Sequence, residues 1–213
     1  MLRSLATRRL AAPLLQARGM ATQVKLPDLP YDYSALEPVI NAEIMELHHK
    51  KHHQAYVNGV NKALEQYAEA EHQGDVGKMI GLQGAIKFNG GGHINHSMFW
   101  KMLCPPKEYE DPSGALEQAI EADFGALDGL VSKFNAAAGG VQGSGWGWLA
   151  YSPESKKLVI TTTPNQDPLQ PTAGLVPLLG IDYKNDRPAY LKEVWKVVNW
   201  AEAGRRFKEA TGA

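Results

Sequence analysis

The spacing of apolar residues predicts a helical first half of the chain. They recur every three or four positions from residue 41 to about residue 71, with no proline and no glycine pair between them. This period predicts one long helix, kinked near Gly59. Just upstream, Ser34 and Glu37 form a capping-box pattern that predicts the start of a helical region.

A second helix is expected after the turn at residues 74–75, running to about Asn89. Together the two helices would form a helical hairpin. Three consecutive glycines at 90–92 predict a break, because each glycine costs a helix about 1 kcal/mol relative to alanine. A further short helix is expected from residue 93 to residue 103, ending before two prolines.

The second half changes from helical to strand-like patterning and back. Its expected elements are helices at 115–124 and 127–138, strands at 145–151, 157–163 and 176–183 with a hairpin turn at 153–155, and a helical region at 188–211. The predicted fold class is α+β: an N-terminal helical hairpin domain (25–110), then a C-terminal domain (111–213) with a small three-stranded antiparallel sheet flanked by helices.

Composition narrows the classes of function. The chain has 213 residues, 44% of them apolar, and 22 basic against 23 acidic residues give a formal charge of -1. No polybasic surface therefore favours a nucleic-acid partner. Cys104 is the only cysteine, which excludes an internal disulfide and a zinc site built on cysteine pairs. No run of about 18 to 20 apolar residues predicts a membrane span.

The charge is unevenly placed along the chain. Residues 1–24 contain four arginines and no acidic residue, with leucines and hydroxyl residues between them. This composition is typical of a cationic amphipathic mitochondrial presequence. Without those arginines, 18 basic and 23 acidic residues remain, so the mature protein would be mildly acidic.

Histidines concentrate in two segments that the predicted helices could bring together. The seven are His48, His49, His52 and His53 in the first helix, His93 and His96 after the glycines, and the isolated His72. On a helix, His48 and His52 share one face, and Tyr56 continues it.

Two readings of this histidine pattern are open. Imidazoles from two elements suit Mn, Fe, Ni, Cu or Zn, and an added carboxylate gives the ligand set of non-haem iron and manganese sites. Alternatively, the first cluster is a solvated helix face that also carries Lys50 and Lys51. The second His-x-x-His pair, at His93 and His96, favours a buried metal site.

Four further segments occur in order: LHHKKHHQAY at 47–56, FNGGGHINH at 88–96, GSGWGW at 143–148 and NQDPL at 165–169. Together they resemble the iron/manganese superoxide dismutase family, and specifically its mitochondrial manganese type. The resemblance runs almost continuously from Leu26 to about Ala203. It implies a redox enzyme of the mitochondrial matrix that converts superoxide to dioxygen and hydrogen peroxide, as a homodimer or homotetramer without nucleic-acid or membrane partners.

The resemblance also implies roles for individual residues. His48, His96 and Asp182 would bind the metal; His52 and Tyr56 would line the substrate path and relay protons; Trp146 would wall the pocket; and Gln166 would hydrogen-bond the metal-bound solvent. The glutamine at 166, with Gly92 where iron-type enzymes carry a glutamine, indicates manganese, with iron as the other candidate.

The sequence departs from the family pattern after Asp182. There the family reads Val-Trp-Glu-His-Ala-Tyr-Tyr-Leu-Gln, whereas this chain continues directly with YKN at 183–185. The absent segment supplies the family's third histidine ligand and the Glu and Tyr that reach the partner subunit. No histidine follows His96, and Asp186 fits a helix start better than a ligand.

We expect the absent segment to weaken metal binding, impair dismutation and cause local strain. The clean excision is typical of a splice variant or a gene-model error.

Two other functions compete with an enzyme of this family. A catalytically inactive dismutase-like structural subunit, of the kind found in mitochondrial ribosomes, would be expected to carry a basic surface and to have lost His48, His96 and Gln166. This chain is acidic and keeps all three. A two-histidine, one-carboxylate iron oxygenase would need a cosubstrate site, and none is visible in the sequence.

Overall fold

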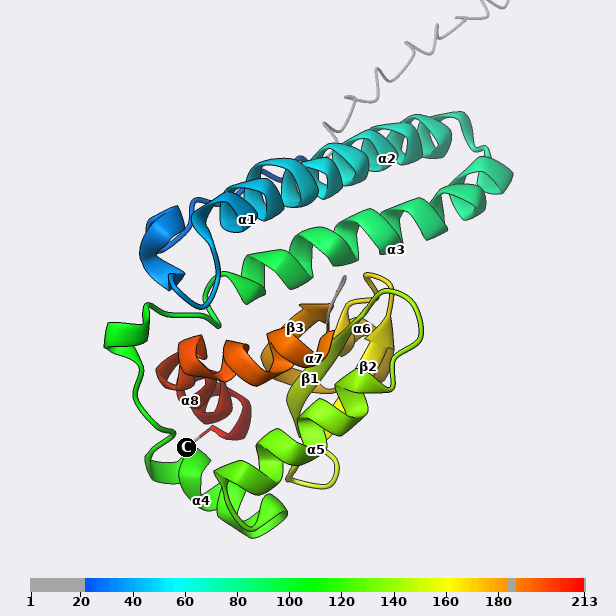
Figure 1. The fold of residues 1–213 in the computed structure, drawn as a ribbon. Helices are drawn as coiled ribbons and strands as arrows, with labels where there is room; N and C mark the ends of the chain where they lie inside the picture. The colour runs from blue at the N-terminus through cyan, green and yellow to red at the C-terminus, as the bar shows by residue number, and fades with distance from the viewer. Residues whose placement is uncertain (1–21, 184–186, 213) are drawn as a thin grey trace, which may run out of the picture.

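The computed structural model describes residues 22–183 and 187–212. A long helical hairpin lies along one side of a second unit that contains a small sheet and the remaining helices (Figure 1). The predicted α+β class is confirmed, with the helical part first in the chain. No helix among the described residues is both long and apolar enough to cross a membrane.

The hairpin consists of two long helical stretches. The first is continuous from α1 (Ala42–Leu47) through η2 (His48–His53) to α2 (Gln54–Gln73), and the second is α3 (Val76–Phe99). Gly74 ends α2 with φ +69°, a conformation that glycine adopts without strain. Asp75 then caps α3 by accepting a hydrogen bond from the backbone of Lys78.

The helical region predicted at Ser34 is only one 3-10 turn (η1, Tyr33–Leu36), and the long helix expected from residue 41 begins at Ala42. Pro38 lies where the interior of a helix started at Ser34 would need a backbone N–H. Asn41 is the cap instead, and its side chain accepts from the backbone of Glu43 over 2.7 Å.

The predicted break at the three glycines is wrong, because α3 passes through residues 90–92 without interruption. The predicted kink is misplaced as well: the irregular turn is the π-helical η2, not Gly59. A side chain on Gly59 would overlap the Asn89 side chain, so this glycine allows α2 and α3 to approach closely. At these positions glycine is required for close contacts with other elements, and helix propensity does not take such contacts into account.

The sheet has three antiparallel strands, as predicted. They are β1 (Gly145–Ser152), β2 (Lys157–Pro164) and β3 (Val176–Tyr183), in the order β2-β1-β3. Every residue of the central strand β1 is buried. In register, Trp146 lies between Thr163 on one side and Asp182 on the other.

Helices of the C-terminal half pack around the sheet (Figure 1). They are α4 (Gly114–Phe124), α5 (Leu127–Gly139), α6 (Leu169–Ala173), α7 (Arg187–Glu193), η4 (Val194–Val197) and α8 (Trp200–Thr211); the short η3 (Pro106–Glu108) lies in the connection between α3 and α4. The helical region expected at 188–211 is therefore interrupted. Val198 forms a β-bridge with Leu103, which also explains why α3 stops at Phe99 and not at residue 103.

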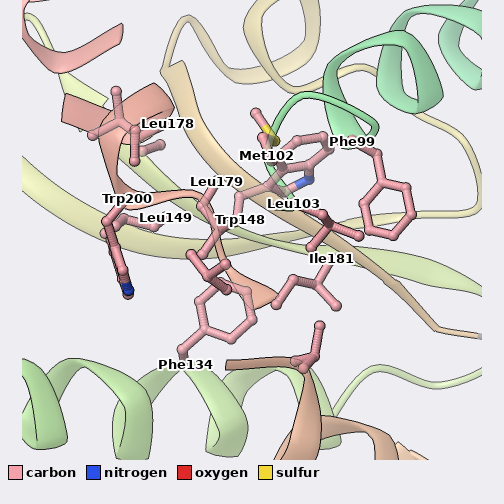
Figure 2. Close-up of a cluster of buried hydrophobic side chains, with 14 of the residues drawn as sticks. Phe99, Met102, Leu103, Phe134, Trp148, Leu149, Leu178, Leu179, Ile181 and Trp200 are labelled. Atoms are coloured by element: carbon pink, nitrogen blue, oxygen red, sulfur yellow. The ribbon is translucent and has the colours of Figure 1, made fainter. Parts of the chain in front are cut away.

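The hydrophobic core joins the end of α3 to the sheet. Figure 2 shows Phe99, Met102 and Leu103 beside the strand residues Trp148 and Ile181. Each of these side chains is almost fully buried, which contributes about 1.5–3 kcal/mol per large apolar residue. The core thereby fixes the second histidine-bearing helix against the strand that carries Asp182.

Candidate metal centre

Three side chains from three separate elements converge at the junction of the two units. His48 begins η2, His96 lies in the last turn of α3, and Asp182 is the penultimate residue of β3. The Nε2 atoms of His48 and His96 are 2.9 Å apart, and the Asp182 Oδ2 atom lies 3.5 and 3.7 Å from them. The structure thus brings together all three residues that the resemblance assigned as ligands.

The π-helical turn shapes the first histidine segment. At its end the backbone N–H of Gln54 bonds to the carbonyl of His49, five residues back. Such wider turns occur often at functional sites. Here the turn lets His53 as well as His48 pack against His96, with ring centroids 5.4 and 4.8 Å from it.

The donor atoms fit a metal ion. A point equidistant from the three atoms lies about 2 Å from each, the usual bond length from a transition metal to imidazole or carboxylate. Both oxygens of Asp182 are buried and accept no hydrogen bond within the described part of the chain. A bound cation would compensate this otherwise costly buried carboxylate.

His96 is oriented for coordination. Its Nδ1 donates to the carbonyl of Gly92 over 2.7 Å, which leaves the lone pair on Nε2, facing His48 and Asp182. A backbone partner of this kind fixes the tautomer and the ring orientation of a ligand histidine. His48, His96 and Asp182 therefore suit manganese or iron. Within the described part of the chain, these three residues form the potential metal-binding group, with ligand atoms that all lie within 4.8 Å of one another.

Tyr56 and His52 lie beside this centre. The ring of Tyr56 packs 5.1 Å from His96 and 5.7 Å from Phe88, and a methyl group on Gly92 would approach it to 2.6 Å. Burial raises the pKa of Tyr56, and the Asp182 carboxylate raises it further. His52 is half-buried, with its ring 6.0 Å from that of His48.

Trp146 and Gln166 form a buried pair that also lies beside His96. The Trp146 ring meets His96 edge-on at 5.2 Å, and its indole N–H donates to Gln166 Oε1 over 3.0 Å. Gln166 follows Asn165, whose φ of +50° turns the chain inward after β2. Because Oε1 already accepts from Trp146, the remaining polar group of the Gln166 side chain is its amide NH₂, which is a hydrogen-bond donor.

The four histidines at 48, 49, 52 and 53 do not form a solvated helix face, because His49 and His53 are buried. The buried pair has contacts that differ from those of His48 and His52. His49 bonds to Tyr33 and to the Pro27 carbonyl, which anchors the leading segment. His53 accepts from the Trp100 indole and bonds to His93 Nδ1 over 3.0 Å. Burial, with smaller contributions from the neighbouring histidines, lowers the pKa of His53 to about 3.

Sequence reasoning missed two aromatic residues of the site. Phe99 and Trp100 pack 5.7 and 5.1 Å from the ring of His48, and Trp100 also holds His53. Their position directly after the His-x-x-His pair was the available signal. Residues 184–186, which include the alternative ligand Asp186 and the expected strain at the excised segment, lie outside the described residues.

Two helices and one strand thus supply a two-histidine, one-carboxylate centre, the donor set of mononuclear iron and manganese proteins. Two family models match the chain: the iron/manganese superoxide dismutase alpha-hairpin domain at residues 23–104 and the C-terminal domain at residues 112–206. The chain belongs to the iron/manganese superoxide dismutase family. It is also 56% identical over 208 residues to "Superoxide dismutase [Mn] 1, mitochondrial" of Arabidopsis thaliana, covering 92% of this chain and 90% of that protein.

Proposed function

We propose that this chain dismutates superoxide at a manganese ion held by His48, His96 and Asp182. The observation that carries the proposal is the convergence of these three donors around one point, with the Asp182 oxygens otherwise unpartnered. Overall, two superoxide anions and two protons give one dioxygen and one hydrogen peroxide. When bound, manganese supplies the one-electron chemistry by alternating between its trivalent and divalent states.

Tyr56 and His52 provide the path for substrate and protons. Each lies beside a ligand histidine: Tyr56 against His96, and half-buried His52 against His48. The raised pKa of Tyr56 keeps its hydroxyl protonated at neutral pH, so that it can donate a proton to the reduced substrate. A net-negative chain requires that the attraction for the anionic substrate be local.

Gln166 and Trp146 tune the centre. Trp146 packs on His96 and fixes the Gln166 side-chain oxygen, so the amide N–H group is held in one orientation. A fixed donor beside a redox ion sets the proton affinity of nearby solvent and, with it, the reduction potential. This role needs a rigid side chain, which agrees with the burial of both residues.

The excised segment impairs the centre in this proposal. Two imidazoles and one carboxylate leave more open positions than a four-ligand site, so metal affinity falls and the potential shifts. A catalytically inactive scaffold is the weaker alternative, because such a protein has no need to keep an oriented His96 and an unpartnered Asp182 carboxylate.

The experiment measures manganese per chain and dismutation per bound manganese. We expect less than one manganese per chain and slow turnover. Inserting Val-Trp-Glu-His-Ala-Tyr-Tyr-Leu-Gln between Asp182 and Tyr183 should restore both, whereas the same insertion with Gln in place of its His should not restore metal content. Full occupancy and normal turnover without the insertion would contradict the impairment. Absence of metal and activity after the insertion would contradict the dismutase proposal itself.

We further infer that residues 1–24 direct the chain to the mitochondrial matrix and that it functions there. The two domains divide near residue 110, between the two family-model matches. Homodimer or homotetramer assembly is supported by the outer face of α3. This face exposes Val76 and Ile80, and open space lies above Gly81 and Gly84 on the same helix.

A further inference from the structure

We propose that one row of α3, formed by Lys87, Gly91 and Asn95, positions Gln166 at the metal centre, and that Gly91 sets the distance. The proposal rests on the role proposed above for Gln166. The three residues are four positions apart, so they lie along a single face of the helix. All three contact the segment 166–168, which is distant in the sequence.

Gly91 makes the closest contact. A methyl group at this position would overlap the backbone carbonyl oxygen of Gln166 and lie 2.8 Å from Pro168 Cδ. The helix backbone and the backbone of the 166–168 segment therefore touch directly, with no room for a side chain. This contact explains a buried glycine inside a continuous helix, despite its cost of about 1 kcal/mol relative to alanine.

The other two residues of the row attach the same segment. Asn95 is fully buried, and its Nδ2 donates to the carbonyls of Gln166 and Asp167 over 3.2 and 3.4 Å. Lys87 Nζ pairs with Asp167 Oδ2 over 2.6 Å at the surface. The segment is thus held by a close contact, two hydrogen bonds and one ion pair.

The segment is also fixed from the sheet side. The backbone N–H of Asn165 donates to the carbonyl of Ser144, just before β1. Gln166 then sits between two rigid elements, and its side chain reaches Trp146. A side chain on the α3 row that displaced residue 166 would change the geometry of the bond between Trp146 and Gln166.

The neighbouring glycines have different contacts, which separates their roles. Gly92 belongs to the next row, with Phe88 and His96, and this row packs against Tyr56. A methyl group on Gly90 would meet only Val60 Cγ2 at 3.4 Å, an ordinary packing distance. The triplet therefore provides a matched control one residue away in the same helix.

The test compares Gly91→Ala with Gly90→Ala in the otherwise unchanged chain. The main readout is the indole ¹H–¹⁵N signal of Trp146 in the metal-free protein, assigned by its loss in Trp146→Phe. We expect Gly91→Ala to shift or broaden this signal and Gly90→Ala to leave it in place. Metal content should stay the same in both, and dismutation per bound manganese should fall about tenfold or more in Gly91→Ala only, because displaced catalytic groups are strongly penalised.

Each outcome decides one of the two proposals. If both alanine variants leave the Trp146 signal unchanged, the positioning role of Gly91 is overturned. If the signal moves only in Gly91→Ala while dismutation per manganese stays unchanged, positioning stands and the role proposed for Gln166 fails. If Gly91→Ala does not fold, Asn95→Ala replaces it, and an unmoved Trp146 signal there overturns the proposal.

Discussion

Trp146 donates its indole N–H to the side-chain oxygen of Gln166 over 3.0 Å, and both side chains are buried. The pair depends on the sheet, because Trp146 sits on the central strand in register with Asp182. Trp146 is thus the backbone neighbour of Asp182 and, through its indole, the partner of Gln166. The geometry of the centre is therefore set by β1 as much as by the histidine-bearing helices.

We predict that Trp146→Phe separates the two functions of this indole. The phenyl ring can still pack against His96, whereas Gln166 loses its donor and becomes free to rotate. Metal content should remain unchanged, and dismutation per bound manganese should fall about tenfold. Stability should fall by about 1–3 kcal/mol, the cost of an unsatisfied buried acceptor.

Trp148→Phe is the matched control. Trp148 stacks on Trp146 on the same strand, but its indole N–H donates to Thr163 over 3.0 Å. It should lose similar stability in urea unfolding and keep its dismutation rate. An equal loss of rate in both variants would contradict a specific role for the bond between Trp146 and Gln166.

A second prediction concerns the Asp182 carboxylate. Asp182→Asn removes a ligand charge with little change of shape, so metal affinity should fall at least about tenfold. The metal-free protein should instead gain about 1–3 kcal/mol, because a buried charge without hydrogen-bond partners is removed. Urea unfolding of the metal-free proteins, with exposed Asp28→Asn as control, measures the gain; a loss of stability would contradict the unpartnered carboxylate.

Much of this fold could be predicted from the sequence, because period and local signals coincide. The strands around GWGW were found by their β-branched and aromatic runs, and the turn at residue 74 by its glycine. Gly91 misled the same reasoning. Its conformation is helical, and the reason for glycine lies in the Gln166 carbonyl 75 positions away, which no local pattern contains.

The candidate site divides in the same way. His48, His96 and Asp182 were assigned by resemblance, and the structure brings them together. Spacing alone gave His48 and His52 one face, but it could not assign His53 to Trp100 and His93, because that depends on the wider π turn and on helix packing.

A third prediction follows from His53, whose pKa is lowered to about 3, chiefly by burial. In the unfolded chain its pKa is about 6.5, so between those values the unfolded state binds the extra proton. The His53 contribution to stability should be constant above about pH 6.5 and fall towards pH 3, by at most about 1.4 kcal/mol per pH unit.

His53→Gln tests this, because the amide can still accept from Trp100 and donate to His93. Urea unfolding of the metal-free protein between pH 7 and pH 5 should give a shallower dependence than the parent chain. The exposed His72→Gln should follow the parent. Identical slopes in all three proteins would show that His53 does not control acid stability.

The fourth prediction concerns assembly through the outer face of α3. Val76 and Ile80 are 62% and 61% exposed and lie four residues apart on this face. An apolar row beside unfilled glycine positions suits close packing of a helix from a second copy. Ile80→Lys should therefore lower the molar mass measured by light scattering, because a buried lysine would lack a partner.

Lys78→Glu, two residues away and on the opposite side of the helix, changes charge without touching the row and should retain the parent mass. An unchanged mass in Ile80→Lys would assign assembly to another surface.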